Sequence, residues 1–225
     1  MLVLIVLSAK AQVCEGSLGD PVVNIDFGRG GGRGPRPDII TSYRYVDVGN
    51  VNGEGDYAIV QSTIGLNGGW FDIFNHTPND FDGYMMVVNA ALDPGVFYES
   101  RTPIDLCPNT TYEFAAWIAN LLRGTGNRPN ITFTIVDMDG NVLKPYNTGD
   151  IANGNPNWKQ YGFQFKTTSA GRVRIRMTNN APGGGGNDLA IDDITFRACG
   201  PEITSSIDNT SLTEQNLHFV RIRTD

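Results

Sequence analysis

The chain of 225 residues has 40% hydrophobic and 10% aromatic residues, which is the composition of a folded protein and excludes a disordered one. Its 27 glycines, with many Asn and Asp residues, indicate numerous tight turns and favour an all-β fold. The formal net charge of -7 argues against a nucleic acid partner, because binding to a phosphate backbone needs clustered Lys and Arg. At this length we expect one large β domain with a short additional segment.

The first eleven residues look like a secretory signal peptide. A short apolar run leads to Ala9-Lys10-Ala11, a small-x-small cleavage pattern, so cleavage is predicted after Ala11. The run is too short to span a bilayer, and no later segment is long and apolar enough to do so. The sequence therefore predicts a secreted or cell-surface protein without a membrane span.

Export makes the three cysteines candidates for a disulfide bond. Three single pairings are possible. Cys14 precedes the first predicted strand and Cys199 follows the last one, so a bond between them would join the two ends of the domain if those strands are neighbours. We favour this pairing, which leaves Cys107 over.

Short stretches of alternating apolar and polar residues predict strands along the chain, with Gly-rich, Asn-Gly and Asp-Gly turns between them. No long amphipathic helical pattern interrupts them. Such a series predicts an all-β, two-sheet antiparallel β-sandwich over residues 12–200, for which a jelly roll is the most economical arrangement. The predicted strands cover about residues 22–27, 42–48, 57–61, 84–89, 96–99, 112–120, 131–137, 159–167, 173–179 and 189–197.

The loop of residues 68–83 is the best candidate for contact with a ligand, because it mixes aromatic rings with amide and carboxylate groups. Aromatic faces suit the apolar face of a sugar ring, and the polar groups suit its hydroxyls. The alternative is that the aromatic residues close the end of the sandwich while the polar residues cap turns. The candidate ligand-binding residues here are Trp70, Phe71, Asn75, His76, Asp80 and Asp82.

The predicted strand of residues 112–120 has apolar residues on both faces, so both faces should be covered. Tyr112, Phe114 and Ile118 lie on one face, and Trp117 lies on the other. Trp117 should therefore lie either under a loop or on the floor of a groove. We include Trp117 among the candidate ligand-binding residues, with a packing role as the alternative.

Carboxylates gather on the predicted last strand, directly after a run of four glycines. If a disulfide joins the ends of the domain, Asp26 on the first strand comes near Asp188, Asp192 and Asp193. Oxygen ligands without a Cys/His cluster favour calcium over zinc. We therefore predict a structural calcium ion, with the alternative that these acids are only solvated strand-end residues.

The sequence contains no motif for a catalytic relay. It has two histidines, His76 and His218, and lacks a nucleophile elbow, a zinc-binding helix and a nucleotide-binding loop. Glycoside hydrolysis by two carboxylates has no local signature, and Glu99, Glu113 or the pair Asp80 and Asp82 could serve it. We predict that the chain is not an enzyme. A glycoside hydrolase ranks a distant third, after the two non-catalytic functions given below.

Residues 201–225 differ in character from the domain, since they are polar and rich in Ser and Thr. They read as a linker or as the start of a truncated following module. The chain is therefore expected to be part of a longer multidomain protein.

Four segments together resemble the galactose-binding-like jelly rolls of carbohydrate-binding modules of the family 4, 9 and 22 group. They span about residues 22–197, and they are the stretches at residues 24–27, 106–117, 158–165 and 190–196. The resemblance implies a calcium ion between the first and last strands, at Asp26 and at Asp192 or its neighbour Asp193. The Gly-rich loop before the last strand and the signal-like start are also similar to secreted and gliding-associated surface adhesins of Bacteroidetes.

Two functional hypotheses of different class follow. The leading one is a non-catalytic, calcium-stabilised module that binds a polysaccharide or a cell-surface glycan, or serves adhesion. The second is a structural β-sandwich spacer in a large cell-surface protein.

Overall fold

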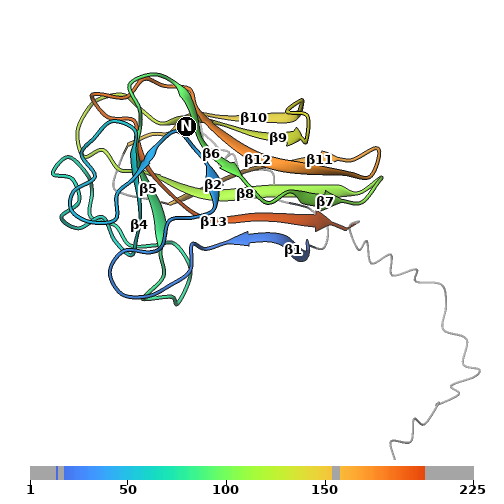
Figure 1. The fold of residues 1–225 in the computed structure, drawn as a ribbon, viewed down its shortest axis with the longest axis horizontal. Helices are drawn as coiled ribbons and strands as arrows, with labels where there is room; N and C mark the ends of the chain where they lie inside the picture. The colour runs from blue at the N-terminus through green and yellow to red at the C-terminus, as the bar shows by residue number, and fades with distance from the viewer. Residues whose placement is uncertain (1–13, 15–17, 154–157, 201–225) are drawn as a thin grey trace, which may run out of the picture.

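The computed structural model describes Cys14 and residues 18–153 and 158–200, which form strands in two sheets without helices (Figure 1). The prediction of an all-β, two-sheet sandwich of the jelly-roll type is confirmed. The proposed signal peptide of residues 1–11 and the proposed linker of residues 201–225 lie outside the described residues, so both stay predictions. Within the described part of the chain, no helix is long and apolar enough to cross a membrane.

The larger, seven-stranded sheet is built around β13. The strand β8 pairs with one edge of β13, while β5 and β1 share the other edge, β5 along Asp188–Ile191 and β1 along Ile194–Cys199. All pairs in this sheet are antiparallel except β3 with β4. Its strands are β1 (Leu18–Ile25), β3 (Arg44–Tyr45), β4 (Asp56–Val60), β5 (Met85–Asn89), β8 (Thr111–Asn120), β11 (Lys159–Lys166) and β13 (Asp188–Cys199).

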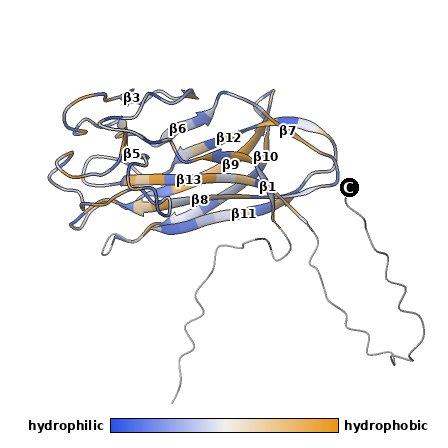
Figure 2. Cartoon of the chain, turned by 90° about the horizontal axis from the view of Figure 1, so that it is seen from below, coloured by the Kyte–Doolittle hydropathy of each residue, from blue (hydrophilic) through white to orange (hydrophobic). Residues whose placement is uncertain are grey.

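The smaller, six-stranded sheet is antiparallel throughout, with the order β10-β9-β12-β6-β2 and β7 paired to the far end of β12. The two sheets stack as layers (Figure 2). Its strands are β2 (Ile39–Ile40), β6 (Gly95–Ser100), β7 (Ile104–Leu106), β9 (Asn130–Asp137), β10 (Val142–Asp150) and β12 (Gly171–Asn179).

The main core lies between the two sheets, where alternate residues of each strand point inward. Aromatic rings from both layers meet in its centre: the ring centroids of Phe114 and Phe133 are 4.9 Å apart, and those of Phe114 and Phe163 are 5.7 Å apart. This packing fixes which face of β8 looks outward, and it leaves Trp117 on the outer face of the larger sheet.

A second hydrophobic cluster lies on the outer face of the larger sheet, at the end of β4 and β5. Long loops around residues 46–73 fold over this end of the sheet and bring Val51, Trp70 and Ile73 onto the strands. Consequently β4 and β5 are buried on both faces, which explains the apolar runs at residues 57–60 and 85–88. The other half of the outer face, along β1, β13, β8 and β11, is not covered in this way.

Three strands were not predicted from the sequence. β2 and β7 are very short, and β10 follows directly after the turn at Asp139-Gly140. Pro145 lies within β10, a residue that normally argues against a strand. The sheet tolerates it because β10 is an edge strand that pairs only with β9.

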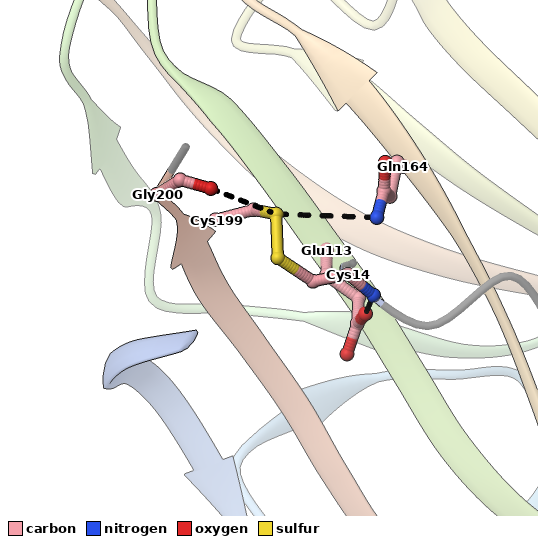
Figure 3. Close-up of a disulfide and its surroundings, with 5 residues drawn as sticks. All are labelled: Cys14, Glu113, Gln164, Cys199 and Gly200. Carbon is pink, nitrogen blue, oxygen red and sulfur yellow. Dashed lines mark hydrogen bonds between the residues drawn. A yellow bond between two sulfur atoms is a disulfide. The ribbon is translucent and has the colours of Figure 1, made fainter. Parts of the chain in front are cut away.

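The disulfide between Cys14 and Cys199 is formed, as predicted (Figure 3). Their Cα atoms are 5.9 Å apart, within the usual range for a disulfide bond. The backbone N–H of Cys14 donates to the carboxylate of Glu113 on β8. The disulfide and this hydrogen bond together attach Cys14 to β13 and β8. Cys107 is exposed and carries a free thiol.

Candidate functional site

The uncovered half of the larger sheet carries a groove of about 450 Å³. Its floor and rim come from β1, β8, β11 and β13, and its wall comes from residues 76–78 in the loop between β4 and β5. The lining residues are Leu18, Asn24, Asp26, His76, Thr77, Pro78, Glu113, Trp117, Gln160, Asp193, Thr195 and Arg197.

Strand register places the floor residues on one face. Gln160 and Asp192 lie opposite Trp117, and Arg197 lies opposite Glu113, so these side chains share the outer surface. Between Asp192 and Thr195 the register shifts, and Asp193 has a positive φ of 44°. A β-bulge re-aims the side chain that it carries, and here Asp193 lines the same groove.

Two adjacent carboxylates bind the loop to β13. The Nδ1 atom of His76 lies 2.6 Å from Oδ2 of Asp193, and the hydroxyl of Thr77 donates to Oδ1 of Asp193 at 2.8 Å. The backbone N–H of His76 donates to Oδ2 of Asp192 at 2.7 Å. These bonds, between residues far apart in the sequence, set the position of the groove wall.

An aromatic stack joins the wall to the floor. The imidazole of His76 lies on the indole of Trp117, with centroids 3.9 Å apart and ring planes at 18°. Trp158 meets the same imidazole edge-on at 5.7 Å, and its indole N–H donates to the carbonyl of Phe74 at 3.2 Å. Trp117 and Trp158 are both partly exposed. The site therefore combines aromatic surface with polar groups.

Asp192 lies beneath this arrangement and is fully buried. Both of its carboxylate oxygens accept backbone N–H groups, one from His76 and the other from Asp193. Burial raises the pKa of the Asp192 carboxyl to about 7, although these N–H groups oppose the shift. Its position indicates a structural role in holding the bulge and the loop together.

Trp70 and Phe71 do not fit the predicted ligand-binding role. Trp70 is only 1% exposed and belongs to the second hydrophobic cluster, so the structure does not place its ring where a ligand could stack on it. Phe71 packs partly buried against the same cluster. The reason is that the loop folds back over the sheet and places its first aromatic residues inward.

Three other predicted ligand-binding residues stabilise the loop itself and lie outside the groove lining. The side-chain amide of Asn75 donates to the carbonyl of Asp80 at 2.9 Å. The carboxylate of Asp80 lies 3.9 Å from Arg29, and Asp82 is exposed and accepts from Gln61 at 3.5 Å. Of the predicted ligand set, His76 and Trp117 are the two residues that line the groove.

The four predicted calcium ligands are not brought to one point. Asp26 and Asp193 line the groove, and Asp192 is buried beside them. Asp188 lies four residues before Asp192 on β13, a distance of roughly 13 Å along the strand, and it pairs with Asn89 of β5. Burial raises the pKa of the Asp188 carboxyl to about 6, although the nearby side chain of Trp70 opposes this rise. Among the described residues, no three His, Cys, Asp or Glu side chains converge as a metal site would require.

Two of the carboxylates considered for hydrolysis, Glu99 and Glu113, lie on different sheets. Glu99 lies on the smaller sheet, where Arg176 donates to it at 2.7 Å and Arg174 lies at 3.5 Å. Glu113 lies on the outer face of the larger sheet and accepts from Cys14. These two acids therefore do not face each other across one cleft.

Groove residues such as Gln160 and Arg197 were not predicted as site residues, and neither was Trp158, which contacts His76 from outside the groove lining. Trp158 belongs to a segment that carried the family resemblance, but no local pattern showed that it meets His76. Gln160, Gly162 and Gln164 alternate with aromatic residues along β11, and this alternation was the available signal for an outward polar face. Arg197 gave no signal, because only the pairing of β13 with β8 places it opposite Glu113.

No protein-family model matches the chain, and a comparison with curated proteins finds no match. Solved structures of similar fold include the apo form of a cyclase from Fischerella sp., at 18% identity over 81% of this chain and 84% of that one, with a TM-score of 0.47. A family 61 carbohydrate-binding module in complex with β-1,4-galactotriose has 18% identity over 62% and 80%, with a TM-score of 0.39. A xylan-binding CBM22-1 domain from Paenibacillus barcinonensis has 11% identity over 86% and 99%, with a TM-score of 0.37. These similarities concern the fold alone.

Proposed function

We propose that this chain is a non-catalytic, extracellular module that binds a polysaccharide or a cell-surface glycan through the groove on its larger sheet. In this proposal the module serves attachment within a longer surface protein. The single observation that supports the proposal most strongly is the partly exposed indole of Trp117 on the floor of a groove with a polar rim. An aromatic floor supplies contact area, and polar groups supply orientation.

The rim offers the hydrogen-bonding groups that a sugar needs. Asn24, Gln160 and Thr195 line the groove and are at least partly exposed. Arg197 adds donors, and its Nε atom is buried without a protein partner among the described residues. Hydroxyl groups both donate and accept, so a mixture of amides, a hydroxyl and a guanidinium suits a polyhydroxyl ligand.

Binding to a panel of xylan, galactan, mannan, β-glucan and polygalacturonate in affinity gels tests the proposal. We expect retention by at least one polymer and a loss of affinity of at least about tenfold in Trp117→Ala, equivalent to ~1.4 kcal/mol. The matched control is Phe81→Ala, because Phe81 is 90% exposed and lies outside the groove lining. Equal binding by Trp117→Ala and the wild type would contradict the proposed site.

A structural spacer is the second candidate function. The burial of Trp70 and the cover of His76 over Trp117 favour it, because both turn aromatic surface inward. A spacer would be retained by none of the polymers, so the same gels separate the two functions.

Calcium stabilisation is a separate proposal that rests on the carboxylates near the two ends of the domain and on the sequence resemblance. The hydrogen bonds of Asp192 and Asp193 occupy their carboxylate oxygens with protein donors, so these residues do not fit a calcium ion as they are arranged. If the native state binds calcium, removing the ion with EDTA must lower the melting temperature, and added calcium must restore it. An unchanged melting temperature would exclude this proposal.

A further inference from the structure

The outward face of Trp117 is already covered by a residue of the chain itself. His76 is stacked on this indole at a centroid distance of 3.9 Å, with the rings only 18° from parallel. A sugar ring that stacks on Trp117 would need the same position. Two rings cannot occupy one face, so a ligand must either use the remaining edge of the indole or displace the imidazole.

We infer that His76, Thr77 and Pro78 form a displaceable lid, here called the His76 lid, which a glycan must move aside to reach Trp117. This inference rests on the proposed function of the groove, since it describes how that site is regulated. The lid residues all line the groove, so a ligand entering it meets them directly.

Asp193 is the main latch of the lid. One of its carboxylate oxygens pairs with Nδ1 of His76 at 2.6 Å, and the other accepts the hydroxyl of Thr77 at 2.8 Å. The His76 and Asp193 side chains are each 18% exposed, so a ligand in the groove can reach this bond. Asp192 adds one backbone hydrogen bond to His76 at 2.7 Å.

The chemistry of a glycan suits the exchange. Two neighbouring hydroxyls can donate to the two oxygens of Asp193 and so replace the donors that His76 and Thr77 withdraw. The sugar ring then replaces the imidazole on Trp117. A vicinal diol on a saturated ring can therefore open the lid without leaving Asp193 unpaired, which a simple apolar ligand cannot do.

A lid of this kind reduces the observed affinity by the fraction of time that the site is open. Replacing His76 with Ala removes the cover but keeps Trp117. If the lid is open about one tenth of the time, affinity rises about tenfold in His76→Ala, and most of the gain lies in a faster association rate. Thr77→Val weakens the latch without changing the imidazole and should give a smaller rise in the same direction.

The experiment is surface-based kinetics with the polysaccharide that binds most strongly in the gels, applied to the wild type, His76→Ala, Thr77→Val and the control Asp72→Asn. Asp72 lies in the same loop, exposed and paired with Arg123 outside the groove. A gain in both lid variants, with the control unchanged, supports the inference. Weaker binding by both lid variants would overturn it and leave the proposed function standing, because His76 would then be a wall that contacts the ligand. If neither the wild type nor the lid variants bind any polymer, the proposed function itself fails.

Discussion

Replacing Cys14 and Cys199 together with Ser should lower the free energy of unfolding by roughly 2–5 kcal/mol. The bond closes a loop with a sequence separation of 185 residues, so its loss frees a large amount of conformational entropy in the unfolded chain. It also holds Cys14 beside Glu113 and the end of β13, where β1 begins its pairing (Figure 3). For a domain of this size the melting temperature should fall by roughly 5–20 °C, measured by calorimetry.

Cys107→Ser is the matched control for this prediction. Its thiol is free and exposed, so the replacement should leave the melting temperature almost unchanged. A double variant that melts at the wild-type temperature would show that the disulfide does not stabilise the domain. Reduction of the wild-type protein should reproduce the effect of the double variant.

Replacing Trp70 with Ala should lower the free energy of unfolding by about 3–5 kcal/mol, because it leaves a cavity in the second hydrophobic cluster. The side chain is 1% exposed and packs among residues of the loops and the larger sheet. The expected result is a lower midpoint in urea unfolding, with glycan affinity unchanged below the transition. Trp70 lies outside the groove lining, so the two readouts separate its packing role from a binding role.

Phe74→Ala provides the comparison for Trp70. Phe74 lies four residues further along the same loop but is 60% exposed, so its truncation should cost far less stability. Loss of glycan binding by Trp70→Ala without loss of stability would contradict the packing role and indicate that Trp70 faces the ligand.

The sequence predicted the β-sandwich because alternation and turn residues are local signals. The Asp139-Gly140 turn and the alternation around Arg174 show this directly, since β9 and β12 lie where expected. The pairing of Cys14 with Cys199 was also predictable, because these residues flank the first and last strands. β10 was missed since Pro145 is acceptable only on an edge strand, and an edge is a property of the finished sheet.

The groove was harder to predict because its geometry depends on contacts between distant segments. The sequence indicated that His76 and Trp117 were of interest, but it did not show that one ring covers the other. It also gave no sign of the bulge that turns Asp193 toward the loop, because the bulge exists only in the pairing of β13 with β8. The burial of Trp70 could not be predicted for the same reason, because the sequence of an aromatic loop is the same whether the loop faces outward or folds back onto the sheet.

The most direct test of the binding groove is an NMR titration of the indole N–H signals with a polysaccharide that binds. The chain has three tryptophans, so each signal reports one position. The groove predicts that the signal of Trp117 shifts as the ligand is added, while that of buried Trp70 stays in place. A titration in which the Trp117 signal remains fixed while the polymer binds would contradict the proposed binding groove.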